Sequence, residues 1–343
     1  MTWSCYRWFF NAFTRMARDN RIDSLKGLLI ILVVLGHVII CLDNINRINH
    51  AVMGVIYIFH MPLFTLLSGF FTKHPDQQTP IDMWRGVLKI FITLMVFHLL
   101  SALWVLSLGL DFVEALLLFP YGVLWYLFSL ICWRIVLYYT PKALLDKPAL
   151  CLGIALTVSI ASGLTHLGNF LAIQRTLNFY LFFLLGYYYR QGMVPVKWWN
   201  NNILHGATVI LLLPLLFWLF PHCGNIMNGA DYYGLQGIPQ KCLILICSVA
   251  MSLLVFNIMP ASRCLNFIGR NTLFYYIYHA FFVDILFIIN AWHFKLPASL
   301  PFILIYTAII MLILWGMSKV KFFRWLVHPT LKFNSAGSTA HRQ

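Results

Sequence analysis

Long apolar runs recur along this chain at short intervals, and they limit the fold more than any other feature. A helix needs about 20 mostly apolar residues to cross a bilayer. Ten candidate runs lie at 24–42, 51–72, 87–108, 121–140, 149–165, 176–190, 203–221, 238–259, 272–294 and 300–317. Only 10% of the residues are charged and 61% are hydrophobic, against about 25% and 45–50% in soluble domains. The pattern predicts an all-α polytopic integral membrane protein with about ten transmembrane helices.

The distribution of basic residues predicts the orientation of these helices. The chain has 24 Lys and Arg residues and 10 acidic ones. With a cytoplasmic N-terminus, 20 of the 24 basic residues fall on the inside, as the positive-inside rule requires. Both termini are therefore predicted to be cytoplasmic. We divide the chain into a cytoplasmic N-terminal segment at 1–20, a membrane domain at 21–317 and a cytoplasmic basic tail at 318–343.

One connection between the apolar runs is itself apolar. Residues 109–120 contain Asp111 and Glu114 and end at Pro120. We predict an interfacial or re-entrant segment there, because a connection of this composition is too polar to span and too apolar to leave the membrane.

The first apolar run carries ionisable side chains on one helical face. Lys26 and His37 are eleven residues apart, which at about 100° per residue is three turns plus roughly 20°. Asp23 lies within about 40° of His37, and the helix rise puts His37 roughly 16 Å deeper than Lys26. Ionisable groups at bilayer depth indicate a function by default. A neutral histidine that hydrogen-bonds between packed helices is the structural alternative.

Two other apolar runs place a histidine beside polar or helix-distorting residues. His60 precedes Pro62, which removes a helical hydrogen bond and commonly kinks a helix. Tyr275 and Tyr276 lie four and three residues before His279, so they can share its face. These side chains could line a pocket. A tolerated packing kink and an interfacial belt of aromatic residues explain the same pattern.

A basic pair, Arg85 and Lys89, occupies what we predict to be the cytoplasmic loop between the second and third runs. The two residues are one turn apart and could hold a phosphorylated ligand. Anchoring at the inner membrane surface is an alternative explanation for both charges.

The same residues resemble the motifs of acyltransferase family 3, a family of membrane O-acyltransferases. The densest matches are Arg21-Ile-Asp-Ser-Leu-Lys-Gly27, Val33-Val-Leu-Gly-His37, and Phe59-His-Met-Pro-Leu-Phe64 before Ser68-Gly-Phe70. Further matches are Arg85, Leu124-Trp-Tyr-Leu127, and Ile268-Gly-Arg-Asn271 running into Tyr278-His279. The resemblance covers 21–317 and is closest to the fucose 4-O-acetylase-like branch. It departs from the O-antigen acetylase branch, because Leu130 stands where that branch has Glu.

The resemblance implies transfer of an acetyl or other short acyl group from cytoplasmic acyl-CoA to a sugar hydroxyl. His37 corresponds to the essential histidine of the family. The acyl-CoA-binding candidates are Lys26, where the family often has Arg, together with Arg85 and Asp23. Candidates for lining a pocket are His60, Ser68, Trp125, Tyr275 and His279.

The chemistry of the reaction is consistent with these assignments. Acyl transfer from a thioester to a hydroxyl needs a base, stabilisation of an oxyanion and a hold on the carrier. An imidazole changes charge near neutral pH, so His37 suits the base. No Ser or Cys forms an obvious pair with His37, which favours direct transfer, and an acyl-histidine intermediate stays an alternative.

We therefore expect acyl-CoA as a donor substrate, a sugar or polysaccharide acceptor, and contact with membrane lipids and surface-polysaccharide assembly proteins. We expect no metal, no permanently bound cofactor and no nucleic acid, and a location in a bacterial inner membrane. The alternatives are a transporter or flippase for a lipid-linked polysaccharide and a subunit of an export complex. Transporters often contain two related halves, and this sequence shows no internal repeat.

Overall fold

Helices account for all the regular secondary structure in the described part of the chain. The computed structural model describes residues 19–42, 47–109, 120–165, 170–193 and 234–327, with 208, 210–212 and 214–215. Seven helices in these ranges are long and apolar enough to cross a membrane. They are α2 (Asn20–Cys41), α3 (Arg47–Phe70), α4 (Pro80–Ser107), α6 (Trp125–Tyr139, extended by the short η2 at Gly122–Leu124), α11 (Gly237–Ile258), α13 (Thr272–Ile288) and α14 (Leu300–Met317). The predicted all-α polytopic fold is confirmed.

Shorter helices complete the bundle. α8 (Pro148–Ser162) and α9 (Ile173–Arg190) match the predicted runs at 149–165 and 176–190, which are short for a full span. The others are η1 (Pro75–Gln77), α7 (Lys142–Leu145), η3 (Phe170–Ala172), α12 (Arg263–Arg270), η5 (Ile289–His293) and α15 (Lys321–Val327). The predicted run at 203–221 and the predicted interfacial segment with Asp111 and Glu114 lie mainly outside the described residues.

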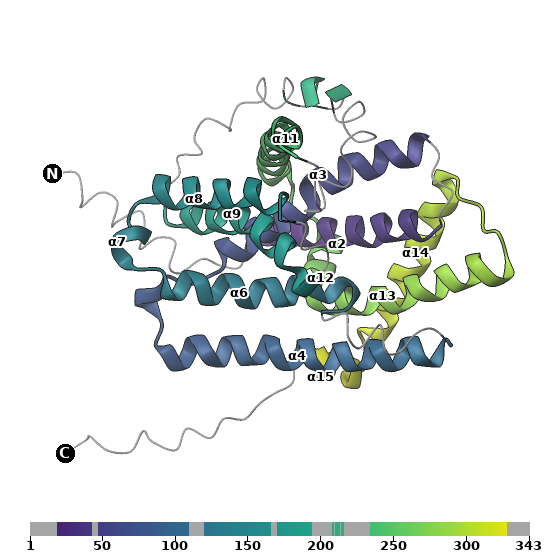
Figure 1. The fold of residues 1–343 in the computed structure, drawn as a ribbon. Helices are drawn as coiled ribbons and strands as arrows, with labels where there is room; N and C mark the ends of the chain where they lie inside the picture. The colour runs from purple at the N-terminus through teal and green to yellow at the C-terminus, as the bar shows by residue number, and fades with distance from the viewer. Residues whose placement is uncertain are drawn as a thin grey trace, which may run out of the picture.

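Helix α2 crosses the middle of the bundle. It packs against α3, α12, α13 and α14, while α4 pairs with α6 and α8 pairs with α9. Figure 1 shows α4 and α6 running side by side below α2, and α11 seen end-on above it. Leu29, Val34 and Val38 are completely buried on α2. The polar side chains of Asp23 and Ser24 on the same helix are buried as well.

Helix α4 begins earlier than the sequence predicted. It starts at Pro80 because the Thr79 hydroxyl accepts a hydrogen bond from the Asp82 amide at 3.2 Å and Pro80 occupies the first helical position. Arg85 and Lys89, which we predicted to lie in a loop, are therefore exposed residues of the first turns of α4.

Glycines bring two pairs of helices into backbone contact. A Cβ atom at Gly69 of α3 would overlap the Phe183 carbonyl of α9, and one at Gly186 of α9 would overlap the Leu66 carbonyl of α3. Gly27 of α2 meets the Leu265 carbonyl of α12 in the same way. Contacts of this kind are common between membrane helices, where small residues let backbones approach closely.

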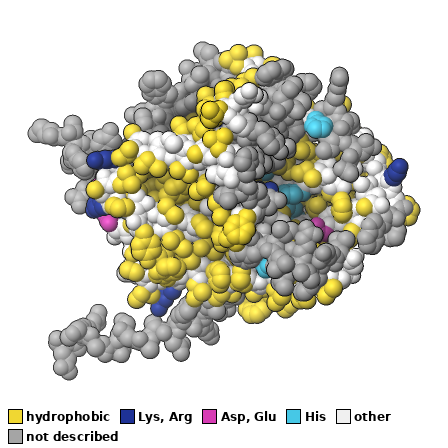
Figure 2. Space-filling model, in the orientation of Figure 1, with side chains coloured by type: hydrophobic (Ala, Val, Ile, Leu, Met, Phe, Trp, Pro, Cys, Tyr) yellow, Lys and Arg dark blue, Asp and Glu magenta, His cyan; other side chains and the backbone are white. Residues whose placement is uncertain are grey.

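The surface of the bundle is typical of a protein that faces lipid. Large apolar side chains are exposed along α4 and α14, among them Leu103 and Leu312, and hydrophobic side chains cover much of the face in Figure 2. Lys142 of α7 forms an ion pair with Asp76 of η1 at 2.7 Å. The hydrogen bond from this ammonium group holds the pKa of the exposed Asp76 carboxyl below its usual range. The α3–α4 and α6–α8 connections therefore lie at the same end of the bundle.

Candidate active site

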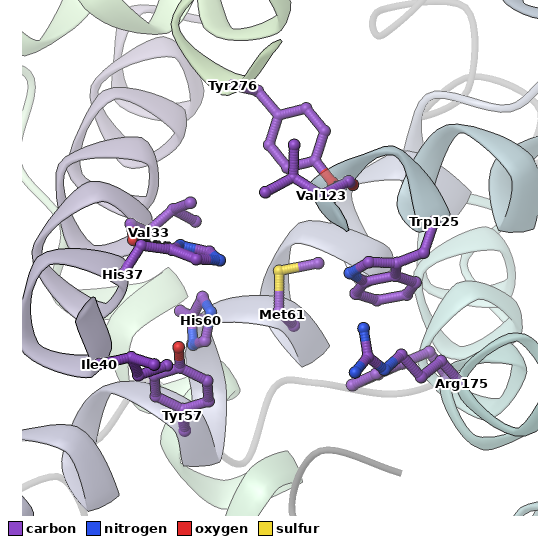
Figure 3. Close-up of a pocket in the computed structure, with 11 residues that line it drawn as sticks. Val33, His37, Ile40, Tyr57, His60, Met61, Val123, Trp125, Arg175 and Tyr276 are labelled. Carbon is purple, nitrogen blue, oxygen red and sulfur yellow. Dashed lines mark hydrogen bonds between the residues drawn. The ribbon is translucent and has the colours of Figure 1, made fainter. Parts of the chain in front are cut away.

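A cavity beside His37 is lined by histidine, arginine, tyrosine and tryptophan side chains. Val33, His37 and Ile40 of α2 lie on one face of the helix, spread over about 10 Å of its rise. They line a cavity of about 160 Å³. The Nδ1 atom of His37 lies 2.8 Å from the Val33 carbonyl oxygen one turn earlier. Because a carbonyl can only accept a hydrogen bond, we infer that Nδ1 carries the proton and Nε2 keeps its lone pair. The Nε2 side of the ring points into the cavity in Figure 3.

Two further histidines share this hydrogen-bond pattern. His60 Nδ1 lies 2.8 Å from the Ile56 carbonyl on α3, and His279 Nδ1 lies 3.2 Å from the Tyr275 carbonyl on α13. The centroids of the His279 and His37 rings are 5.0 Å apart. His279 Nε2 is buried and has no hydrogen-bond partner among the described residues. Three helices thus gather three imidazoles whose Nε2 atoms accept protons but have none to donate.

Aromatic side chains form much of the remaining wall. Trp125, the first residue of α6, stacks on Phe179 of α9 with centroids 5.5 Å apart and an interplanar angle of 27°. The centroids of the Tyr57 and His60 rings are 4.8 Å apart. The Tyr276 hydroxyl donates a hydrogen bond to the Val123 carbonyl. Apolar walls with a few polar tips are typical of sites for small molecules.

Arg175 supplies the positive charge of this cavity. It is the third residue of α9, it lines the cavity, and its guanidinium lies 5.5 Å from the centroid of the Trp125 ring. The chain enters α9 through Leu171 and Ala172, whose φ angles of 48° and 51° are left-handed. This conformation costs roughly 1–2 kcal/mol for each such residue. Backbone strain of this kind concentrates at functional sites.

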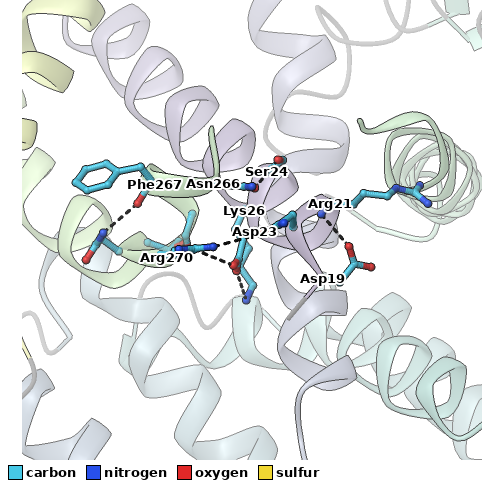
Figure 4. Close-up of polar contacts among 12 residues, drawn as sticks. Asp19, Arg21, Asp23, Ser24, Lys26, Asn266, Phe267 and Arg270 are labelled. Carbon is cyan, nitrogen blue, oxygen red and sulfur yellow. Dashed lines mark hydrogen bonds and ion pairs between the residues drawn. The ribbon is translucent and has the colours of Figure 1, made fainter. Parts of the chain in front are cut away.

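A second polar cluster lies at the opposite end of α2 (Figure 4). The Asp23 carboxylate, which is 4% exposed, lies 3.9 Å from Lys26 Nζ and 3.6 Å from Arg270 Nε of α12. Lys26 Nζ also lies 4.1 Å from the centroid of the Phe71 ring. Arg21 donates hydrogen bonds to the Met259 and Asn257 carbonyls at the end of α11.

Cationic side chains of α12 line another cavity beside this cluster. Arg263, Asn266, Phe267 and Arg270 follow one face of the helix and, with Asn20, line a cavity of about 270 Å³. Arg85 lines neither this cavity nor the one around His37. The predicted acyl-CoA-binding residues are thus distributed over α2 and α4.

The structure brings together some of the predicted pocket residues and separates others. His60 and Trp125 line the cavity. His279 does not line it, and its ring packs against the His37 ring with the centroids 5.0 Å apart. The Ser68 hydroxyl is bonded to the Tyr126 hydroxyl at 2.7 Å and does not line it. Tyr275 is completely buried elsewhere, and its neighbour Tyr276 lines the cavity in its place.

Three residues that line the cavities were not predicted from the sequence: Tyr57, Arg175 and Arg263. Tyr57 lies three residues before His60, so helical spacing could have indicated it. Arg263 lies seven residues before Arg270, which places both on one helical face. Nothing near Arg175 in the sequence indicates its contact with Trp125, fifty residues earlier.

The bundle of apolar helices agrees with the membrane-protein family that the sequence resembles. Residues 19–318 match the family model described as Acyltransferase domain, of acyltransferase family 3. The nodulation protein NolL of Sinorhizobium fredii is 46% identical over 56 residues, a segment that spans 16% of this chain and 15% of that relative. No solved structure matches the chain. Because the family model covers most of its length, this multi-pass membrane protein belongs to acyltransferase family 3.

Proposed function

We propose that the protein is an O-acyltransferase that moves an acetyl or other short acyl group from cytoplasmic acyl-CoA to a sugar hydroxyl. The acceptor is a cell-surface or lipid-linked sugar, and the protein works in a bacterial inner membrane. The family assignment supports acyl transfer. The donor and the acceptor class are part of the proposal.

The observation that carries the proposal is the hydrogen bond of His37. With Nδ1–H bound to the Val33 carbonyl at 2.8 Å, Nε2 is the free basic atom at the cavity wall. A general base must present such a lone pair to the proton that it removes. The bond also fixes the ring, so the base needs no rearrangement before it acts.

The reaction proposed for this site is a direct transfer. His37 Nε2 takes the proton of the acceptor hydroxyl while the oxygen attacks the thioester carbonyl. The tetrahedral intermediate collapses as the C–S bond breaks, and the CoA thiolate leaves with the proton that His37 returns. The products are the O-acyl sugar and CoA, and the base is restored.

The distance along α2 supports a cytoplasmic donor. The helix is unbroken between Lys26 and His37, so its rise separates them by about 16 Å. Lys26 and Arg270 hold positive charge at the end where we expect the CoA phosphates, and Arg85 adds an exposed charge near the start of α4. The pantetheine arm would extend from these charges toward His37.

The proposal is tested with membranes that contain the protein, radiolabelled acetyl-CoA and glycans extracted from the same cells. Wild-type membranes should transfer label into glycan. His37→Gln should lower the rate about 10²–10⁴-fold, because an amide cannot take the proton. The wild-type rate should also fall as the pH is lowered, because a protonated imidazole has no lone pair.

The matched comparison is His37→Ala. If His37 is the base, the Gln and Ala variants should be equally inactive and equally well inserted. If it only joins helices, Gln should recover much of the activity and Ala should lower the amount of folded protein. Near-normal turnover by His37→Gln would remove this residue from the chemistry.

A further inference from the structure

The cavity around His37 contains a cation that the proposed reaction does not use. Arg175 forms none of the ion pairs found among the described residues, and its guanidinium lies 5.5 Å from the centroid of the Trp125 ring. Among the described residues that line the cavity, none is an Asp or a Glu. A charged side chain that lines a cavity inside a membrane protein usually serves a substrate or ion. The geometry therefore leaves the guanidinium available to an anion that enters the cavity.

Arg175 lies on the side of His37 that faces away from Lys26. Ile40 is the second-last residue of α2 and Arg175 is the third residue of α9, so both mark the end of the bundle opposite Lys26. In Figure 3 the guanidinium lies on the Ile40 and Tyr57 side of the cavity, whereas Val33 and Tyr276 lie on the other side. With the predicted orientation this is the outer side. The donor and the ligand of Arg175 thus approach His37 from opposite directions.

The chemistry of the guanidinium defines the ligand. Arginine presents a planar fork of N–H donors that matches a carboxylate or a phosphate. The guanidinium lies over the Trp125 ring, which itself stacks on Phe179, and this contact limits the positions that the fork can take. The Nε2 atoms of His37 and His60 accept hydrogen bonds, so they suit hydroxyl groups rather than an anion.

We propose that the acceptor is an acidic sugar, whose carboxylate or phosphate binds Arg175 and so presents a neighbouring hydroxyl to His37. This inference rests on the proposed function and specifies its acceptor. The anion is either the carboxyl group of a sugar acid or a phosphate ester, including one that links a sugar to a lipid carrier. Both sources offer anionic oxygens that accept hydrogen bonds from the guanidinium.

The first experiment neutralises the acceptor. Glycans and glycolipids from the same cells are either reduced at their carboxyl groups through a carbodiimide or stripped of phosphate esters with aqueous hydrofluoric acid. Each preparation is then incubated with wild-type membranes and radiolabelled acetyl-CoA. One treatment should lower label incorporation about tenfold or more, and the labelled product from untreated glycans should bind an anion exchanger. The effective treatment identifies a sugar acid or a phosphate.

The second experiment changes Arg175 and uses a control on the same helix. Arg190, at the other end of α9, also places its guanidinium over a ring, 5.4 Å from the Phe70 centroid, and does not line the cavity. Arg175→Gln should raise the acceptor KM about 10- to 100-fold and leave the acetyl-CoA KM unchanged. Arg175→Lys should give an acceptor KM between those of wild type and Arg175→Gln, because lysine keeps the charge but lacks the planar fork of donors. Arg190→Gln should behave as wild type.

The outcomes separate this inference from the function on which it rests. Label in a neutral product, full acceptor activity after both treatments, or an unchanged acceptor KM in Arg175→Gln would overturn the acidic acceptor alone. An absence of label in every glycan with wild-type membranes would overturn the proposed function and this inference with it. If Arg175→Gln inserts poorly, Arg175→Lys and the acceptor treatments still decide the question.

Discussion

Lys26 and Arg270 both lie beside the buried Asp23 carboxylate. The effect of Lys26 on donor binding can therefore be measured without leaving this carboxylate unpaired. Asp23 lies within 4.0 Å of both Lys26 and Arg270. In Lys26→Ala the Asp23 charge still faces Arg270, so we expect the variant to fold and insert. The loss of one charge-assisted phosphate contact of about 1.5–3 kcal/mol should raise the KM for acetyl-CoA about 10- to 100-fold.

Two comparison variants accompany this measurement. Lys26→Arg should keep the wild-type KM for acetyl-CoA, since a guanidinium also binds phosphate. Lys142→Ala, which removes an exposed pair with Asp76 at the same end of the bundle, should change neither stability nor KM measurably. A wild-type KM in Lys26→Ala would move the donor site away from α2.

Ser24 joins α2 to α12 through a single buried hydroxyl. It donates to the Asn266 side chain at 2.6 Å and accepts from the Ser262 amide at 2.7 Å. Ser24→Ala leaves both partners without this bond, which should lower the free energy of unfolding by about 1–3 kcal/mol. Thermal unfolding of the protein in detergent measures the change. Ser107→Ala, which removes an exposed hydroxyl bonded within its own helix, is the control and should be near neutral.

Single residues differ in how far the sequence could predict their surroundings. The position of His37 on the face of Lys26 followed from helical spacing, because α2 is one regular helix. The protonated atom of His37 depends on a bond to Val33 that no pattern of residue types specifies. The same limit applies to Tyr275, which we predicted at the cavity where Tyr276 lies. Neighbouring residues of a helix point about 100° apart, so the sequence alone does not decide which of the two faces the cavity.

The helix pair α3–α9 positions two walls of the cavity at once, because His60 belongs to α3 and Arg175 to α9. The pair is closed by Gly69 against the Phe183 carbonyl. Gly69→Ala should force the helices apart and cost about 1–3 kcal/mol or more of unfolding free energy, as overpacking usually does. Transfer activity should fall with it. Unfolding temperature and label transfer are the two measurements.

Gly153→Ala is the matched control for this contact. Gly153 lies in the interior of α8 with no neighbouring atom within 4 Å of an added Cβ. Alanine is favoured over glycine in a helix by up to about 1 kcal/mol, so this variant should be neutral or slightly more stable. Equal behaviour of the two variants would contradict the role given to the α3–α9 contact.

The extent of each helix could be predicted where apolar length alone decides it. The run at 300–317 coincides with α14, and the run at 238–259 is shifted by one residue from α11. The start of α4 was placed seven residues too late, because a cap at Thr79 extends the helix beyond its apolar part. The approach of α9 to α6, which creates the Arg175–Trp125 contact, is a tertiary event that hydropathy does not encode.

The two ends of the whole molecule have different chemical tasks in the proposed reaction. The Lys26 end gathers basic side chains for the donor, and the Arg175 end receives the acceptor. Both tasks require a fixed orientation in the membrane, which the basic residues predict. The Asp76–Lys142 ion pair limits the possible topologies, because it requires the α3–α4 and α6–α8 connections to lie on the same side of the membrane.

Reporter fusions test this orientation at three described positions. Fusions after Gln77 and after Lys147 should both report the cytoplasm, because the 2.7 Å ion pair places their connections at one end of the bundle and the predicted inner side carries most of the basic residues. A fusion after Leu296, between α13 and α14, should report the outside, since α13 starts beside the Lys26 end and crosses away from it. Opposite signals after Gln77 and Lys147 would contradict the fold. A consistent but reversed set would keep the fold and exchange the sides, so that Arg175 would face the cytoplasm and an acidic acceptor would have to come from there.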